Sequence, residues 1–196
     1  MIIHHDPEFV ITLQRVIEFI GTFAFALSGI RLAASKHYDW LGGFVCGIAV
    51  AIGGGTIRDV MLGVRPFWML SPIYMICTLF AQCVVIVCHH YLRRLDATWF
   101  LFDTLGLALF NIAGIQKTLE CGFPFWVAII MGCITGAAGG VIRDVLLNEE
   151  PVIFRKEIYA MACVVGGLTY WLLSWLQVSL YITVIATFAI VCAIRF

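Results

Sequence analysis

Two short segments of the sequence place an arginine and an aspartate side by side, directly after a cluster of glycines. Residues 53–62 read GGGTIRDVML and residues 138–147 read AGGVIRDVLL. Charged side chains in a membrane cost about 2.5–3.5 kcal/mol each and persist only when they are paired or hydrated. These residue types therefore indicate either an ionic clamp between helices or a water-filled path for ions. The candidate residues in the two segments are Gly53, Gly54, Gly55, Thr56, Arg58, Asp59, Gly139, Gly140, Arg143 and Asp144.

The two segments are 85 residues apart, and the same offset aligns further residues without a gap. It pairs Glu18 with Asp103, Gly29 with Gly114, and Tyr74 with Tyr159. This self-similarity predicts a duplicated unit covering residues 10–94 and 95–179, followed by one extra helix over residues 180–196. Glu18 and Asp103 are expected either to join the same ion path or to be helix-end carboxylates at the membrane interface.

The composition requires a membrane to accommodate these units. Hydrophobic residues make up 62% of the 196 positions and charged residues 12%, which is more apolar surface than a soluble domain of this size buries. A spanning helix needs about 20 residues. Seven apolar runs predict seven helices in one membrane domain, residues 1–196, and they cover approximately residues 11–30, 41–60, 68–91, 99–115, 125–147, 158–176 and 180–194.

Three helices per unit is an odd number, so the second unit must enter the membrane from the opposite side. The fold class expected is therefore an all-α polytopic membrane protein with 3+3 inverted repeats plus one C-terminal helix. Glycines in the second helix of each repeat either allow close helix packing or let the helix unwind and expose carbonyl groups. Because neighbouring residues on a helix point apart, we expect the charges to pair across the repeats: Arg58 with Asp144 or Asp103, and Arg143 with Asp59 or Glu18.

Neutral polar residues on the same helices carry two interpretations. Their oxygens either replace part of the hydration shell of an ion or bond back to their own helix backbone. Thr56 is the first candidate for the ion path because it lies between the glycines and Arg58. The other residues of this kind are Thr22, Ser28, Asn111 and Thr135.

Several other classes of function are disfavoured. Twelve basic residues balance twelve acidic ones, so there is no basic surface for nucleic acid. The eight cysteines lie in or beside apolar runs without C-x-x-C spacing, which predicts no metal site and no cofactor. Neither H-E-x-x-H nor G-x-S-x-G occurs, and we expect no enzyme activity.

The basic residues of the predicted loops set the expected orientation. Seven of them fall after the first, third and fifth helices and at the C-terminus, and three fall on the other side. The positive-inside rule then predicts an extracytoplasmic N-terminus and a cytoplasmic C-terminus. The seven are Arg31, Lys36, Arg93, Arg94, Arg155, Lys156 and Arg195, and the three are Arg15, Arg65 and Lys117.

With paired GGGTIRD and GGVIRD motifs on the second and fifth predicted helices, the sequence resembles the trimeric intracellular cation (TRIC) channel family over nearly its whole length. The resemblance implies a homotrimer in which each protomer has its own pore for monovalent cations such as K⁺ and Na⁺. It also implies that the second and fifth helices are kinked at their glycines and line that pore. The phosphoinositide-binding motif of animal members does not map onto this chain, which favours a member from the bacterial plasma (inner) membrane, surrounded by lipid.

A second function remains open. Bacterial relatives are also catalogued under a domain label reading "glycine transporter". Inverted repeats with broken helices also hold substrates in secondary transporters, where helix N-termini face a carboxylate. The alternative is thus a secondary transporter of a small zwitterion such as glycine.

Overall fold

Long apolar helices build the chain in the computed structural model, which describes residues 7–88, 98–155 and 158–195. In this part of the chain the longer helices are α1 (Pro7–Ser35), α2 (Trp40–Met61), α3 (Ile73–Val87), α5 (Thr98–Glu120), α6 (Phe125–Leu146), α8 (Ile158–Trp175) and α9 (Leu180–Arg195). A short 3₁₀ turn, η1 (Phe67–Met69), precedes α3, and a four-residue helix, α7 (Val152–Arg155), precedes α8. The expected all-helical architecture is confirmed.

By length and composition, four of these helices can cross a membrane: α1 from Ile11 onward, α2, α5 and α6. The helices α3, α8 and α9 are apolar but shorter. The arrangement of seven spans as three plus three plus one therefore remains a prediction.

Several predicted boundaries were wrong. The first helix continues to Ser35, so Arg31 lies in a helix rather than in the expected connection, and the fourth continues to Glu120. The third does not begin at Trp68, because Pro72 starts a new helix after the 3₁₀ turn. Residues 89–91 of that predicted span lie outside the described residues.

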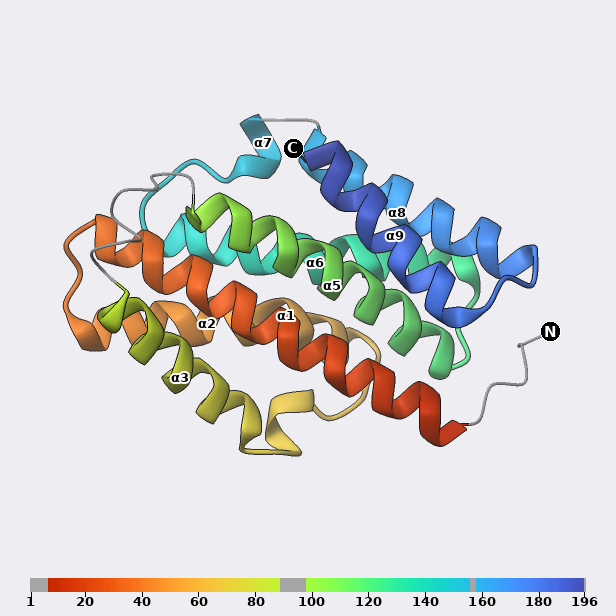
Figure 1. Ribbon diagram of the computed structural model, residues 1–196, viewed down its shortest axis with the longest axis horizontal. Coiled ribbons are helices and arrows are strands. Elements are labelled where there is room, and N and C mark those ends of the chain that lie inside the picture. Colours follow the sequence, from red (N-terminus) through yellow and green to blue (C-terminus); the bar gives the residue numbers. More distant parts are fainter. Residues whose placement is uncertain (1–6, 89–97, 156–157, 196) are drawn as a thin grey trace.

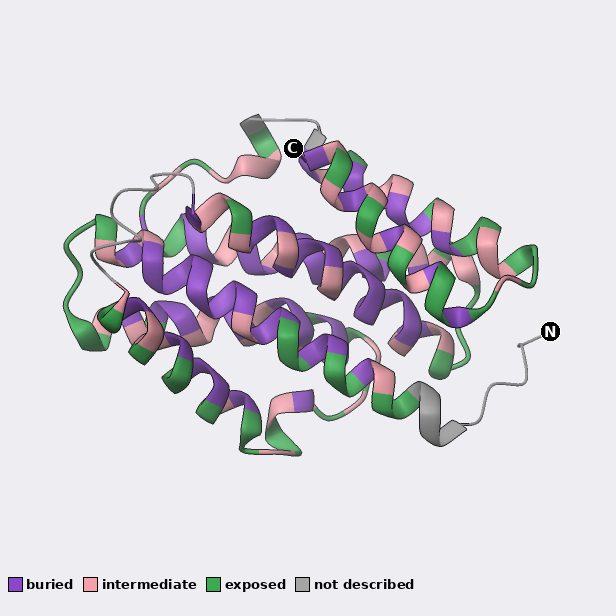
Figure 2. Cartoon of the chain, in the orientation of Figure 1, coloured by how far each residue is buried: buried purple, intermediate pink, exposed green. Residues whose placement is uncertain are grey.

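The centre of the molecule consists of α1, α2, α5 and α6 (Figure 1). In this view α1 and α5 lie side by side, with α2 and α6 behind them, while α3 flanks α1 and α8 and α9 flank the other side. Buried residues concentrate where α1 and α5 face the other helices, and exposed residues lie on the outer faces (Figure 2). The buried charges are carried by these central helices and by the last turn of α9.

Contacts at the centre occur in pairs related by the 85-residue offset, with the roles of the two halves of the chain interchanged. Gly21 packs under the ring of Phe110, and Gly106 packs under the ring of Phe25. The two rings stack on each other with centroids 5.3 Å apart and an interplanar angle of 17°. Reciprocal contact between equivalent residues is what a local two-fold axis produces.

Polar contacts join the ends of α1 and α6. Lys36 forms an ion pair with Glu149, and the Tyr38 hydroxyl donates to the carbonyl of Leu146 at 3.2 Å. The α1–α2 connection and the segment after α6 therefore lie at the same end of the helix bundle.

Candidate functional site

Two buried ionic clusters lie at the centre, one in each half of the chain. In the first, Arg58 on α2 donates from Nε to Asp59 Oδ1 at 2.7 Å and from Nη2 to Glu18 Oε1 at 2.9 Å. In the second, Arg143 on α6 donates from Nε to Asp144 Oδ1 at 2.9 Å and from Nη1 to Asp103 Oδ1 at 2.5 Å.

The charged groups of both clusters are shielded from solvent. Arg58 and Arg143 are 0% exposed, and their acidic partners are at most 5% exposed. Buried charges are tolerated only with partners of good geometry, and removing one partner typically costs about 3–5 kcal/mol. Each cluster therefore ties the first helix of its half to the second.

The second oxygen of each aspartate fixes the chain that follows. Asp59 Oδ2 accepts from the backbone N–H of Phe67 at 2.7 Å, and Asp144 Oδ2 accepts from that of Val152 at 3.0 Å. Phe67 and Val152 are themselves 85 residues apart. Each aspartate thus orients its arginine and also holds the start of η1 or α7.

The expected pairing of charges across the repeats was wrong. Each arginine pairs with its own neighbouring aspartate and with the carboxylate 40 residues earlier in the same half. The prediction assumed that neighbouring side chains on a helix point too far apart to pair. The long arginine side chain nevertheless folds back far enough for its guanidinium to reach the next residue. Nη2 of Arg58 and Nη1 of Arg143 donate to the first helix of the same half. Arg143 Nη1 also donates to the other half of the chain, to Ser28 Oγ at 2.8 Å.

Aromatic rings cover the guanidinium groups, a feature that sequence reasoning missed. The guanidinium carbon of Arg58 lies 5.7 Å from the ring centre of Phe67, and that of Arg143 lies 4.9 Å from Trp99. Such contacts stabilise a desolvated cation. Phe67 and Trp99 occupy different places in their repeats, so the 85-residue offset gives no signal for them.

A third arginine belongs to the second cluster. Arg195, in the last turn of α9, donates from Nη2 to Asp103 Oδ2 at 2.6 Å and is 8% exposed. Its guanidinium carbon lies 4.6 Å from the Phe100 ring centre and 4.3 Å from that of Tyr159. Arg195 was counted above among the basic residues of the loops and the C-terminus, whereas it lies in α9 and is buried in an ion pair.

The glycine clusters lie in continuous helix. Both α2 and α6 are α-helical through Gly53–Gly55 and Gly139–Gly140, so the alternative in which these segments unwind was wrong for this conformation. The glycines allow close contact instead. A Cβ on Gly54 would overlap the carbonyl oxygen of Thr135, and one on Gly139 would lie 2.9 Å from the carbonyl oxygen of Val50. Val50 and Thr135 are also 85 residues apart, so the crossing of α2 and α6 is reciprocal.

The last glycine of each cluster makes room for an aromatic side chain of the charge site. A Cβ on Gly55 would overlap the ring of Phe67. One on Gly140 would overlap the Tyr159 hydroxyl and lie 3.1 Å from Asp103 Oδ1. Glycine at these two positions therefore lets the rings approach the arginines.

The neutral polar residues follow the helix-bonding interpretation in three cases. The hydroxyls of Thr22, Thr56 and Thr135 donate to the carbonyls four residues earlier, at 2.7, 2.7 and 2.5 Å. Thr56 Oγ1 also accepts from Trp68 Nε1 at 3.0 Å. Asn111 donates from Nδ2 to the carbonyl of Cys163 at 3.3 Å.

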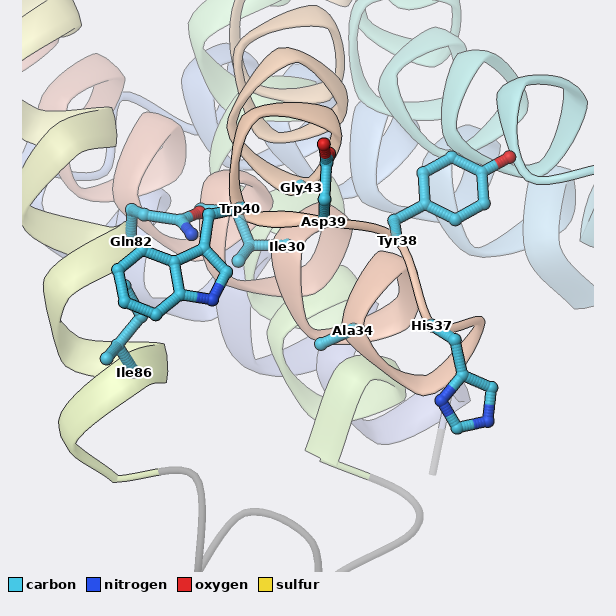
Figure 3. Close-up of a pocket in the computed structure, with 9 residues that line it drawn as sticks. All are labelled: Ile30, Ala34, His37, Tyr38, Asp39, Trp40, Gly43, Gln82 and Ile86. Carbon is cyan, nitrogen blue, oxygen red and sulfur yellow. The ribbon is translucent and has the colours of Figure 1, made fainter.

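A surface pocket lies apart from the charge clusters, between the end of α1, the start of α2 and α3. Figure 3 shows the indole of Trp40 beside Gln82 and Ile86. None of the residues proposed from the sequence as site residues lines it. Its lining residues are Ile30, Ala34, His37, Tyr38, Asp39, Trp40, Gly43, Gln82 and Ile86.

Comparison with known proteins gives one family match and several similar chains. A family model described as "Glycine transporter" matches twice, at residues 15–90 and 100–175, which is again an offset of 85. The inner membrane protein YadS of Escherichia coli K12 is 41% identical over 157 residues, 79% of this chain and 75% of that protein. The membrane protein YvgT of Bacillus subtilis is 34% identical over 181 residues, 91% of this chain and 89% of that protein.

Among solved structures, the TRIC trimeric intracellular cation channel orthologue from Rhodobacter sphaeroides superposes with a TM-score of 0.89. It is 31% identical in sequence, and the match covers 94% of this chain and 95% of that one.

Proposed function

The chain belongs to the glycine transporter family, as a bacterial-type member of the TRIC channels, and from this premise we propose that it conducts monovalent cations such as K⁺ and Na⁺. The structurally similar Rhodobacter protein is described as a cation channel orthologue, which supports this function rather than an enzymatic one. The inner membrane location of the E. coli relative supports the same location for this protein.

One pore per protomer is proposed where the two halves meet, between α2 and α6 and beside α1 and α5. The observation that carries this proposal is the pair of buried ionic clusters flanking the α2–α6 glycine crossing. Ionisable groups at such a depth in a membrane protein are costly and mark ion pathways more often than packing sites. Gly53–Gly55 and Thr56 with Glu18, Arg58 and Asp59 would form one side of the path, and Gly139, Gly140, Asp103, Arg143 and Asp144 the other.

The present conformation is a closed one in this proposal. Arg58 and Arg143 are completely buried, and the glycine faces of α2 and α6 are in backbone contact. Conduction would require these helices to separate or bend at the glycines so that water reaches the charged groups. The same glycines that permit close packing would supply the hinge.

The assembly and orientation are also proposals. Membership of the family supports a homotrimer with three separate pores, with the outer apolar faces buried against lipid or neighbouring protomers. The N-terminus is proposed to be extracytoplasmic and the C-terminus cytoplasmic. Arg31 and Arg195 are both buried, and without them five basic residues remain on the cytoplasmic side against three, so the predicted orientation does not change.

Single-channel recording tests the proposal. The purified protein in planar bilayers should give discrete unitary currents that reverse at the K⁺ equilibrium potential under a K⁺ gradient. Asp59→Asn and Asp144→Asn should alter the unitary conductance or the open probability. Each substitution removes the charge that pairs with the neighbouring arginine and weakens the hydrogen bond that holds the start of η1 or α7. Glu149→Gln removes a carboxylate outside both clusters and serves as the matched control. Folded protein without unitary currents would refute the channel.

A small-zwitterion transporter is the alternative, favoured by the description of the family model. It predicts saturable uptake of glycine into proteoliposomes, without unitary currents. Uptake and current measured on the same preparation therefore separate the two functions.

A further inference from the structure

The two ionic clusters differ in charge although their residues correspond at the 85-residue offset. With all groups ionised, the second cluster balances Asp103 and Asp144 against Arg143 and Arg195. The first cluster sets two carboxylates against a single arginine, Arg58. It therefore carries one net negative charge.

The difference centres on one oxygen of one carboxylate. In the second cluster, Asp103 Oδ2 binds the guanidinium of Arg195 at 2.6 Å, and that guanidinium lies against the Tyr159 ring. In the first cluster the corresponding pair is Glu18 and Tyr74. Among the described residues, Glu18 Oε2 accepts a hydrogen bond from the Tyr74 hydroxyl at 3.4 Å, which is long.

A net charge at this depth needs a partner. Glu18 is 5% exposed, Asp59 1%, Arg58 0% and Tyr74 6%. An uncompensated buried charge is strongly unfavourable, and proteins neutralise it with a counter-ion or a proton. Of the other basic residues on this side, Lys117 is paired with Glu120 at 3.6 Å, and Arg15, which faces Tyr74, is exposed to solvent.

We propose that a monovalent metal cation, K⁺ or Na⁺, binds at Glu18 Oε2 beside the Tyr74 hydroxyl. The position of this cation corresponds to that of the Arg195 guanidinium in the second cluster. The second cluster is therefore neutralised by an arginine of α9, and the first by a cation from solution. The inference rests on the proposed cation conduction, to which it adds a specific, asymmetric binding site.

Oxygen atoms lead from the surface to this position. Glu120, at the end of α5, has a side chain that is 30% exposed. With its amide nitrogen facing α5, Gln14 donates to Glu120 Oε2 at 2.9 Å. Gln14 is one helical turn before Glu18 on α1, so the two side chains are neighbours on the same face. The polar side chains of Glu120 and Gln14 thus lie between the exposed end of α5 and Glu18.

The remaining polar atoms favour a partly hydrated cation. Arg58 Nη1 has no hydrogen-bond partner among the described residues, and a water molecule on the cation offers the oxygen it needs. A zwitterion such as glycine could bind Arg58 and Glu18 together, but it would leave the cluster with its net negative charge. Charge balance therefore selects the cation.

Thermal unfolding of the detergent-solubilised protein tests the site. Samples at one ionic strength and pH contain KCl, NaCl or N-methyl-D-glucamine chloride, whose large cation cannot enter a buried site. A cation at ten times its Kd should raise the Tm by about 3–6 °C over the bulky cation. Adding glycine to the bulky-cation sample should leave the Tm unchanged.

Two variants and one control locate the effect. Glu18→Gln makes the first cluster neutral and should abolish the difference between K⁺ and the bulky cation, while Tyr74→Phe should reduce it. Glu149→Gln, the same chemical change in a loop, should keep the full difference. Should Glu18→Gln fail to fold, Tyr74→Phe alone decides, because it removes one oxygen and no charge.

Three results would overturn the inference. The first is a cation effect on the Tm that survives in the folded Glu18→Gln variant or, where that variant does not fold, one that Tyr74→Phe leaves undiminished. The others are stabilisation by glycine in place of K⁺, and a Tm that responds to pH and not to metal cations. The last would assign a proton to Glu18, whose titratable and charged neighbours are Arg15, Arg58, Asp59, Tyr74, Lys117 and Glu120. Unitary currents without a Glu18-dependent Tm shift refute the site and leave the channel standing. A Glu18-dependent Tm shift without unitary currents supports the site and refutes the channel.

Discussion

Gly53 and Gly54 are adjacent in a run of three glycines, yet the structure predicts opposite responses to alanine. A Cβ on Gly54 would overlap the carbonyl oxygen of Thr135 and lie 3.2 Å from its carbonyl carbon and 3.4 Å from the backbone nitrogen of Gly139. All three atoms belong to the backbone of α6, so the two helices would have to move apart. A Cβ on Gly53 would overlap only the terminal Cδ1 of Ile142, with the next atom 3.7 Å away.

The expected magnitudes follow from two opposing terms. Alanine gains up to about 1 kcal/mol over glycine in a helix interior. Overpacking a tight contact costs about 1–3 kcal/mol, and the upper end applies where the neighbour is backbone. Gly54→Ala should therefore lose about 2 kcal/mol of unfolding free energy, which lowers the Tm by about 4–8 °C at this chain length. Gly53→Ala should leave the Tm unchanged or raise it by up to about 4 °C, because the end of Ile142 can rotate away.

Tryptophan fluorescence during heating in detergent measures both variants beside the wild type. The adjacent substitutions share the same change in composition and the same helix, so their difference reports the contact alone. If Gly54→Ala proves as stable as Gly53→Ala, the close crossing of α2 and α6 at this residue is refuted.

Further outcomes follow from the ionic clusters and the orientation. A double-mutant cycle of Arg58→Gln with Glu18→Gln should show a coupling of about 1–3 kcal/mol in unfolding free energy. The cycle of Arg58→Gln with Asp144→Asn should be additive within about 0.5 kcal/mol. The reverse pattern would show that the charges pair across the repeats. Arg195→Met should cost about 3–5 kcal/mol, measured as lost thermal stability, because Asp103 then loses one of its two cations, and a neutral result would contradict its role in the core. A green fluorescent protein fused after the last residue should fluoresce and an alkaline phosphatase fused there should be inactive, as the cytoplasmic C-terminus requires.

The agreement between sequence and structure is best where the information is local. Continuous apolar runs predicted the helices to within a few residues in most cases, because length and hydropathy alone decide whether a segment can be helical in a membrane. The errors have specific causes. Pro72 moved the start of α3, and α1 continues through Arg31 to Ser35.

The sequence indicated which charged residues lie inside the helix bundle, but not which of them pair with one another. Glu18, Arg58, Asp59, Asp103, Arg143 and Asp144 do cluster and are buried, as an offset of 85 residues between costly charges suggested. The pairing within each half was not predicted, since it depends on how α1 crosses α2 and α5 crosses α6. Arg195 was missed because a basic residue at the end of an apolar helix normally faces water.

The sequence by itself determined that this chain is a helical membrane protein with an internal repeat, and it determined which few charged residues carry information. Those conclusions rest on composition, run length and periodicity, which a chain has before it folds. Only the tertiary structure decided which carboxylate faces which arginine, which of two adjacent glycines touches backbone, and that α9 delivers a second arginine to Asp103 and none to Glu18. These are distances between helices far apart in the chain, and they are set by how the helices cross and pack.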